Sequence, residues 1–493
     1  MATDRALAPG RGPAAARLRA LSGLTLFHAG MILAPLCAFV VTLVQPADYD
    51  YWWHRRTGEY IVEKLAVPYA DPFAFTTAGK TWIDHEWLAQ VVMYGIDATL
   101  GYLALFAFML GLGVAAWFII YRLLRAEGVA RMQALALSMA PLVLGASHWR
   151  PRPSMFTVFF LALLLSELFA ARRGERRTLW RLVPIMALWA NLHGGYVIGL
   201  AVLGIFAAAS LLERSEAPGW KHAAIVLGAS FLATGLNPYT WRVWLYPFTY
   251  FFGDNASLQL VDEWQSADFH QLRNAPFALL LLAAMLTGGI GRRFDAFRSS
   301  LLLLFAALAL QSMRHQPLFA LAWAPCVGVA LAERFDWWRT ELPLGGRVSP
   351  LNSGLLLGAG AALAMSVFAS PSGMPFRDAP SGGLRPYPEA GAAYINGHME
   401  GAHVFNTYEW GGFLIERFEH GNRVFIDGRA DLHGSLVSEY QRVYRGDRWR
   451  ESFERYGVDA ALLPAGAPLV KDLRADGWRT VYEDGVQVVL VAP

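Results

Sequence analysis

The chain has 493 residues, of which 55% are hydrophobic and only 16% are charged. Soluble domains carry about 25% charged residues, so this composition excludes a disordered chain, a coiled coil, a collagen or a disulfide scaffold and argues against a plain soluble enzyme. The formal net charge is only +3, so nucleic acid is not an expected partner. The apolar excess must therefore face lipid.

Long apolar stretches cover most of the chain before residue 371. Because a spanning helix needs about 20 mostly apolar residues, they predict a polytopic α-helical membrane domain over 21–370 with about eleven transmembrane helices. A basic leader over 1–20 precedes it. The expected spans are Leu21–Gln45, Leu100–Leu123, Met132–Ser147, Ser154–Ala171, Leu182–Asn191, Tyr196–Leu212, Ala223–Leu236, Ala275–Ile290, Ser299–Gln311, Leu318–Leu331 and Leu351–Ser370. The fifth of these is either a separate span or, with the Leu192-His193-Gly194-Gly195 segment as a break, part of one longer helix.

Lysine and arginine set the orientation of such a chain. The leader and alternate loops are rich in arginine, and the loops between them are poorer in it. The positive-inside rule therefore places the N-terminus in the cytoplasm and, with an odd number of spans, the C-terminus outside. We expect a multi-pass protein of a bacterial inner membrane whose last domain is periplasmic.

Two regions outside the spans are predicted to fold. In the first outer loop, 46–86, apolar residues at near-helical spacing over Asp50–Leu65 predict an amphipathic helix at the membrane interface, and His85–Tyr94 predicts a second. Residues 371–388 are rich in Pro, Gly and Ser, as linkers are. Residues 389–493 alternate short β-rich runs with helical stretches, which predicts a small α/β domain outside the cytoplasm.

Chemically capable side chains gather in the predicted outer loops, whereas the cytoplasmic loops hold little besides arginine. Carboxylates, imidazoles and guanidinium groups at the edge of a bilayer are costly without a partner or a purpose. A sugar carried on a lipid phosphate would need such residues, because the lipid stays in the bilayer while its sugar reaches the surface. The distribution therefore indicates an enzyme that acts on a lipid-linked substrate at the outer face.

Each type of residue suits one part of that reaction. Guanidinium groups pair well with phosphate, and the candidates to bind the donor phosphate are Arg150, Arg152, Arg314 and His315. Asp48 or Asp50 would deprotonate the acceptor, or would hold a divalent cation such as Mg²⁺ or Mn²⁺ against the phosphate. The candidates to contact the rest of the substrates are His54, Asp84, His85, Glu86, His193, Glu263, Trp264 and His270.

Several of these residues also have a plain structural explanation. Asp48 and Asp50 could cap the helix that follows them. Arg150 and Arg152 could snorkel toward the interface, although the flanking prolines and the departure from the positive-inside bias favour a ligand role. His193, beside two glycines, could simply mark a helix break.

The same residues resemble the GT-C superfamily of polytopic glycosyltransferases, which includes oligosaccharyltransferases, protein mannosyltransferases and aminoarabinose transferases. Members carry acidic residues after the first span, where this chain has Asp48-Tyr49-Asp50, and Asp84-His85-Glu86 occupies the place of a second motif. The resemblance implies an inverting transfer from a polyprenyl-phosphate or polyprenyl-diphosphate sugar, with Asp48 or Asp50 as base or metal ligand. It leaves the acceptor open between a lipid, a glycan and a protein.

Two motifs stand out in the tail. The segment from Asn406 to Gly412 resembles the tryptophan-rich, glycine-ended motif of oligosaccharyltransferases, which implies binding of an acceptor peptide. The run that contains Asp427, Gly428 and Arg429 is typical of a tight turn after a strand. Alternatively, Asp427 and Arg429 face the membrane site and help to hold the acceptor.

Two other classes of protein are alternatives to a transferase. A transporter or flippase of a lipid-linked or polar solute would carry ionisable residues at mid-membrane, and the mid-span stretches are almost free of charge, with Glu167 as the nearest exception. A non-catalytic membrane assembly protein would tolerate loss of Asp48 and Asp50 but would fail on deletion of 389–493. The one-sided polar cluster favours the glycosyltransferase.

Overall fold

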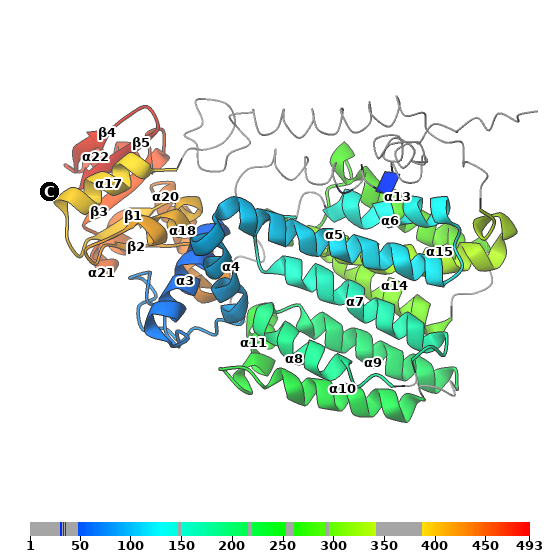
Figure 1. Ribbon diagram of the computed structural model, residues 1–493. Helices are drawn as coiled ribbons and strands as arrows, with labels where there is room; N and C mark the ends of the chain where they lie inside the picture. The colour runs from blue at the N-terminus through cyan, green and yellow to red at the C-terminus, as the bar shows by residue number, and fades with distance from the viewer. Residues whose placement is uncertain are drawn as a thin grey trace, which may run out of the picture.

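The computed structural model describes residues 48–145, 149–176, 178–214, 219–252, 261–290, 295–341 and 387–493, with four isolated positions between 30 and 35. The basic leader, most of the expected first span, the whole of the expected last span and most of the linker lie outside the described residues. The described chain forms a bundle of apolar helices with a small α/β unit beside one end (Figure 1).

The bundle follows the order of the predicted spans. Its helices are α5 (Tyr102–Ala126), α6 (Arg131–Gly145), α7 (Ser154–Arg172), α8 (Leu182–Leu192), α9 (Tyr196–Leu212), α10 (Trp220–Thr234), α11 (Arg242–Phe252), α13 (Ala275–Ile290), α14 (Ala296–Gln311) and α15 (Gln316–Arg334). Single-turn helices lie between them at η1 (Asp262–Trp264), η2 (Leu272–Asn274) and η3 (Met313–His315), and η4 (Asp336–Trp338) follows α15. The sequence did not indicate α11. It left the α8–α9 connection open, and the structure breaks there, since His193 has an extended backbone.

Among the described helices, three are long and apolar enough to cross a membrane by length and composition, namely Tyr102–Ala126, Ser154–Arg172 and Met313–Arg334. Four further apolar helices are shorter. Helix α15 is apolar on nearly all sides and is buried along almost its whole length, as a central helix must be. These helices support a membrane protein, and the count of about eleven spans stays a prediction.

The α/β unit at the C-terminal end is built on a five-stranded mixed sheet with the order β2-β1-β3-β5-β4. Its strands are β1 (His403–Asn406), β2 (Arg423–Val424), β3 (Ala460–Pro464), β4 (Arg479–Glu483) and β5 (Gln487–Val491). Strand β1 runs parallel to β2 and β3, and β5 runs antiparallel to β3 and β4. The helices of the unit are α17 (Glu389–His398), α18 (Tyr408–Arg417), α19 (Ala430–His433), α20 (Leu436–Tyr444), α21 (Trp449–Tyr456) and α22 (Pro468–Ala475). The predicted α/β character of this segment is confirmed.

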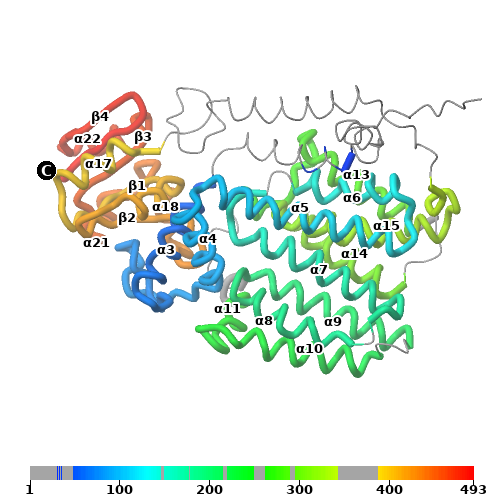
Figure 2. Tube along the Cα trace, viewed as in Figure 1, coloured from blue at the N-terminus to red at the C-terminus, as the bar shows by residue number. Residues whose placement is uncertain are grey.

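The described part of the first loop, 48–86, lies between the bundle and the α/β unit. The helix predicted over Asp50–Leu65 is α3 (Asp50–Lys64), and the one predicted over His85–Tyr94 corresponds to α4 (Trp87–Leu100), which directly follows the loop. Figure 2 shows that α3, near the start of the chain, lies beside α18, near its end. The rings of Trp52 and Phe413 meet edge to face across this contact at 5.2 Å.

The stretch between α3 and α4 also extends the sheet. Ala74 pairs in parallel with Val424 of β2, the Phe75 N–H donates to the Val424 carbonyl at 3.1 Å, and the Thr76 hydroxyl donates to the Phe425 carbonyl at 2.6 Å. Because β2 is an edge strand, the first loop covers the groups that this edge would otherwise expose. This pairing joins the loop that follows α3 to the sheet of the C-terminal unit.

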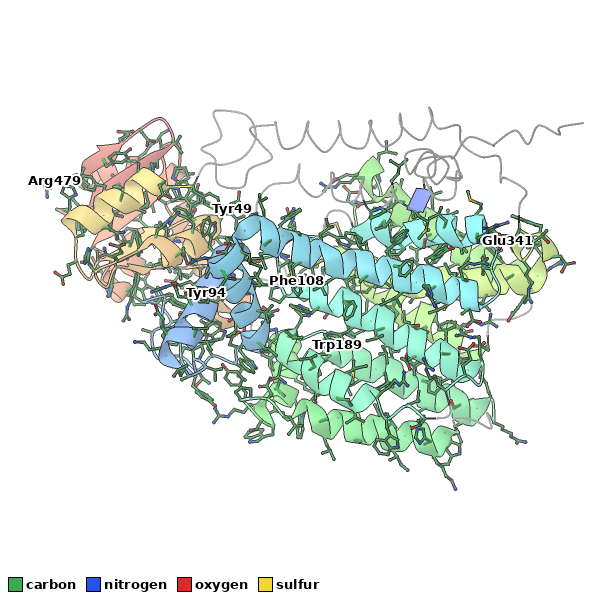
Figure 3. All side chains as sticks on the ribbon, viewed as in Figure 1. Tyr49, Tyr94, Phe108, Trp189, Glu341 and Arg479 are labelled. Carbon is green, nitrogen blue, oxygen red and sulfur yellow. The ribbon has the colours of Figure 1, made fainter. Side chains whose placement is uncertain are left out.

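The bundle has two chemically different ends, which Figure 3 marks by Tyr49 at one end and Glu341 at the other. Toward the Glu341 end, arginines pair with carboxylates on the same or neighbouring helices. The pairs there are Arg131–Glu341, Arg172–Glu213, Arg173–Glu127 and Arg298–Asp295. The residues singled out by the sequence lie toward the Tyr49 end.

Candidate functional site

One guanidinium group collects three carboxylates at the Tyr49 end of the bundle. Arg152 stands just before α7 and donates from Nη2 to Asp48 Oδ1 at 3.0 Å and to Asp50 Oδ2 at 3.1 Å. Its Nη1 donates to Glu263 of η1 at 2.9 Å, and its Nε contacts the other oxygen of Asp48. Three segments that are distant in the sequence therefore meet at one arginine.

Three carboxylates share the single guanidinium group of Arg152. Asp48 is almost fully buried, and its Oδ1 accepts the Asp50 backbone N–H at 3.0 Å, while the indole N–H of Trp53 donates to Asp50 at 3.1 Å. Burial, followed by the charge of Asp48, raises the pKa of Asp50 to about 7, although Arg152 acts in the opposite direction. Asp50 is therefore suited to exchange a proton near neutral pH.

A second polar cluster surrounds Glu86. His54 Nδ1, His85 Nε2 and His193 Nε2 lie 3.7, 3.6 and 3.4 Å from the carboxyl oxygens of Glu86. Burial, together with the charge of Asp84, raises the pKa of Glu86 well above its usual value. Burial also lowers the pKa of His85 to about 4 and the pKa values of the other two imidazoles well below their usual range. At neutral pH the three imidazoles are uncharged hydrogen-bonding groups, and burial favours the protonated form of Glu86.

The orientation of His193 follows from its other contacts. Its Nδ1 accepts the backbone N–H of Gly195 at 3.0 Å and lies 2.7 Å from the hydroxyl of Thr157. That hydroxyl in turn accepts the indole N–H of Trp189 at 2.9 Å. Because Nδ1 is an acceptor, the ring proton sits on Nε2, which faces Glu86.

Helix α3 connects the two clusters. Asp50 and His54 are four residues apart, so they share one face of the helix. The ring of His54 packs on Trp53 at a centroid distance of 3.6 Å, and Trp53 holds Asp50. A substrate between the clusters would meet an ionisable carboxylate on one side and neutral donors and acceptors on the other.

The remaining predicted residues of the membrane part fall into two groups. The Arg314 guanidinium lies 4.1 Å from the centroid of the Trp264 ring and 3.5 Å from Glu263, and His315 lies 6.1 Å from Trp264 by ring centroids. These residues border the Arg152 cluster. His270 is fully exposed and pairs with Asp268, so the structure does not bring it into either cluster.

Asp84 and Arg150 flank the clusters. Asp84 is buried, its side chain accepts the Gln90 amide N–H at 2.8 Å, and burial together with the charge of Asp431 raises its pKa to about 8. Arg150 is half-buried, and its carbonyl accepts the Arg152 N–H at 2.7 Å within the proline-flanked turn. This turn fixes the direction of the chain before α7.

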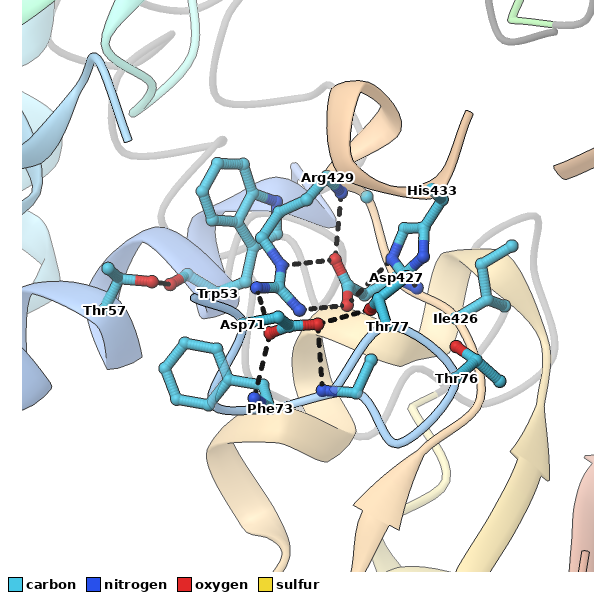
Figure 4. A network of polar contacts seen from close by, with 12 residues as sticks. Trp53, Thr57, Asp71, Phe73, Thr76, Thr77, Ile426, Asp427, Arg429 and His433 are labelled. Carbon is cyan, nitrogen blue, oxygen red and sulfur yellow. Dashed lines mark hydrogen bonds and ion pairs between the residues drawn. The ribbon is translucent and has the colours of Figure 1, made fainter. Parts of the chain in front are cut away.

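Asp427 and Arg429 form an internal network with the first loop (Figure 4). The Arg429 guanidinium donates to Asp427 at 2.6 and 2.8 Å and to Asp71 at 2.6 Å, and all three side chains are fully buried. His433 Nε2 lies 3.1 Å from Asp427. Burial opposes ionisation of Asp427, but Arg429 and His433 hold its pKa well below the usual value. The geometry favours the structural interpretation of this turn over direct contact with an acceptor.

The residues of the site contain the donor types that Mg²⁺ or Mn²⁺ would take. Within the described ranges, however, no group of three or more His, Cys, Asp or Glu side chains is arranged to hold a metal ion. The present geometry does not fit a cation, since Asp48 and Asp50 close on the Arg152 guanidinium. The positive charge that balances these carboxylates therefore comes from the Arg152 guanidinium group.

Comparison with known proteins adds to this geometry. No protein-family model and no curated protein matches the sequence. Among solved structures, the oligosaccharyltransferase of Archaeoglobus fulgidus, tethered to an acceptor peptide, matches with a TM-score of 0.58 at 12% identity, over 89% of this chain and 69% of that one. ArnT from Cupriavidus metallidurans, bound to undecaprenyl phosphate, matches with a TM-score of 0.51 at 13% identity, over 94% and 98%.

The arabinofuranosyltransferase AftD from mycobacteria matches as well, with a TM-score of 0.54 at 14% identity, over 94% of this chain and 41% of that one. This chain has the GT-C fold. The likeness predicted from Asp48-Tyr49-Asp50 is thus confirmed for the fold, and identities of this size carry no finer conclusion.

Within the GT-C fold of this chain, sequence reasoning missed the residues that join the tail to the first loop. Asp71 and His433 are not among the candidate residues of the sequence analysis, and Gly428 appears there only as part of a tight turn. A weak signal was present, since Asp71 and Thr77 bracket a turn-rich segment and their side chains hydrogen-bond in the structure. The partner of Asp71 stands 358 residues away, and no local pattern identifies it.

Proposed function

We propose that this chain transfers a sugar from a polyprenyl-phosphate or polyprenyl-diphosphate donor to a cell-envelope acceptor. The observation that carries the proposal is the convergence of Asp48, Asp50 and Glu263 on Arg152 at one end of an apolar bundle. Its fold supports the assignment, since structures that share it include one bound to undecaprenyl phosphate and one tethered to an acceptor peptide.

In this proposal Asp50 is the general base. With a pKa of about 7 it is partly ionised at neutral pH and can take the proton of an acceptor hydroxyl or amide. As that proton leaves, the acceptor atom forms a bond to the anomeric carbon from the face opposite the phosphate. The bond from the anomeric carbon to the phosphate oxygen breaks, its electron pair stays on the phosphate, and the configuration inverts.

The arginines have different roles in this proposal. All the contacts of Arg152 described above go to carboxylates, so it positions Asp48, Asp50 and Glu263. Arg314, stacked on Trp264, is the better candidate to bind the donor phosphate, with Arg150 and His315 nearby. The neutral groups around Glu86 are suited to hydrogen bonds with sugar hydroxyls.

The placement of the reaction completes the proposal. We place the site at the periplasmic face of a bacterial inner membrane, with the N-terminus in the cytoplasm and residues 389–493 as a periplasmic domain. The arginine-rich end of the bundle supports this orientation. The acceptor is a lipid, a glycan or a protein of the envelope.

The test is a transfer assay with purified protein in lipid nanodiscs. Radiolabelled polyprenyl-phosphate and polyprenyl-diphosphate sugars serve as donors, and fractionated envelope lipid, glycan and protein serve as acceptors. The Asp48→Asn and Asp50→Asn variants are compared singly with Asp268→Asn, an exposed carboxylate outside the clusters. Loss of a general base lowers the rate by about 10²–10⁴-fold, and we expect this for at least one of the first two. Full activity of both, at normal membrane expression, refutes the assigned role.

A further inference from the structure

The turn of the C-terminal unit that contains Gly428 lies directly on Asp50. A β-carbon added at Gly428 would overlap Oδ1 of Asp50 and would lie 3.2 Å from its Cγ and 3.1 Å from the indole nitrogen of Trp53. Gly428 does not have a positive φ, so the backbone accepts alanine there without strain. Residue 428 must be glycine because a side chain there would overlap the Asp50 carboxylate.

Two more glycines, both in α18, allow close packing at this junction, one against the start of α3 and one against the turn itself. A β-carbon at Gly412 of α18 would lie 2.8 Å from the Tyr49 carbonyl oxygen and 3.3 Å from Cδ1 of Trp53. At Gly411 it would overlap the Ile426 carbonyl oxygen, which belongs to the strand end that leads into the Gly428 turn. Gly412 thus lies against the backbone of residues 49–53, and Gly428 lies against the side chains of Asp50 and Trp53, while Gly411 lets α18 pack closely on the turn.

The turn that contains Gly428 is held in place by contacts other than those with Asp50. Arg429 ties it to Asp427 and, across the junction, to Asp71 of the first loop, with all three side chains out of contact with water. The Gly428 carbonyl also accepts the Tyr408 hydroxyl at 3.3 Å. A side chain at residue 428 therefore cannot be accommodated by a small shift of the turn alone.

Asp50 is fixed from the other side. Its two oxygens are occupied by the Trp53 indole N–H and the Arg152 guanidinium, each at 3.1 Å. Any rotation that makes room for a methyl group at residue 428 breaks at least one of these hydrogen bonds. Asp50 and the turn are thus each held in place where they meet.

We infer that Gly428 is a positioning residue, whose bare α-carbon lets the C-terminal unit close on Asp50 and form one wall of the site. The inference rests on the proposed function, since it assigns the tail a part in placing the base. It differs from a separate acceptor-binding module, which would contact substrate without constraining Asp50. The Asp50 side chain is 30% exposed, and the Gly428 turn supplies part of the burial that is the main cause of the raised pKa of that carboxyl.

The experiment compares Gly428→Ala with Gly466→Ala, a matched change in the same unit where a β-carbon meets open space. We expect Gly428→Ala to lower kcat on the order of 100-fold, the usual cost of a displacement of about 1 Å, with KM for the donor little changed. We also expect the acid limb of its pH profile to move to lower pH, since Asp50 would gain water while Asp48, Glu263, Glu86 and Arg152 still face it. Gly466→Ala should match the unmodified chain.

A purely structural role for Gly428 predicts a different result. It would lower thermal stability and the amount of active protein but would leave KM, the pH limb and the rate per folded molecule unchanged, and that result overturns the inference. Wild-type kcat and pH profile in Gly428→Ala overturn it as well.

Hydrogen exchange of the backbone over 48–53 separates this inference from the proposed function. Faster exchange in Gly428→Ala than in Gly466→Ala supports the wall even if the protein transfers none of the sugars offered. If Asp50→Asn abolishes transfer while Gly428→Ala changes neither transfer nor exchange, the inference fails and the proposed function stands.

Discussion

The two ends of the helical bundle use the same charged residues in opposite ways. At the Glu341 end, Arg131 donates to Glu341 at 3.1 Å, and both side chains are about half exposed. At the other end, Arg152 is largely buried and serves Asp48, Asp50 and Glu263 together. Arg125 also contacts Glu341, and such an exposed group, in which arginine is in excess over carboxylate, costs little and anchors a loop. A buried excess of acid over base does not serve stability, and its raised carboxyl pKa is what a proton-transfer site requires.

The largest effect should come from removing the shared arginine. Arg152→Gln leaves Asp48 and Asp50 without their cation, although Glu263 keeps Arg314 at 3.5 Å, so Asp50 loses its counter-charge and one of its two hydrogen-bond donors. We expect transfer rates to fall by about 100-fold or more. Arg131→Gln, at the other end, is the matched control and should keep the normal rate. Equal rates in the two variants would abolish the distinction between the two ends.

The junction between the first loop and the tail should show its effect in stability. Arg429→Met leaves Asp71 and Asp427 buried without their cation, which typically costs about 3–5 kcal/mol of unfolding free energy. Thermal unfolding in detergent measures this, and Arg450→Met, which removes an exposed pair with Asp476, should cost about 1 kcal/mol or less. A small loss in Arg429→Met would mean that the network does not hold the tail.

The smallest expected effect is a shift in pH dependence. Asp50 accepts a proton only when it is ionised, so kcat/KM should rise with pH and level off above its pKa of about 7. Glu263 is one of the negative charges that raise this pKa, so Glu263→Gln should move the rising limb to lower pH. The pH–rate profile of the two proteins measures the shift. An unmoved limb would show that a group other than Asp50 sets it.

Much of the fold was predictable because it follows from local composition. Apolar runs predicted the helices of the bundle, and the alternation of β-rich and helical runs predicted the α/β character of the tail. Two elements escaped for identifiable reasons. Helix α11 carries Pro247 inside an aromatic run, which reads as an interruption, and β4 is an edge strand whose polar residues mask the pattern.

The site was predictable in its members but not in their pairing. Topology gathers these loops at one end, and the structure brings most of the predicted acids, histidines and arginines together there, although His270 lies outside both clusters. Which arginine binds carboxylates and which stays near Trp264 depends on side-chain direction, and Arg152 reaches across more than a hundred residues. The space required at Gly428 could not be predicted either. The sequence of a turn that contains a glycine is the same whether or not a carboxylate lies against that glycine.

The pairing of Ala74 with the edge of the C-terminal sheet has a consequence for biosynthesis. The first loop leaves the ribosome early, but its partner strand is made more than three hundred residues later. Until then Asp50 lacks its wall, and afterwards β2 is covered as soon as it folds, which protects an edge that would otherwise pair with other chains. Under the proposed function, a chain that lacks β2 and the Gly428 turn lacks one wall of the site.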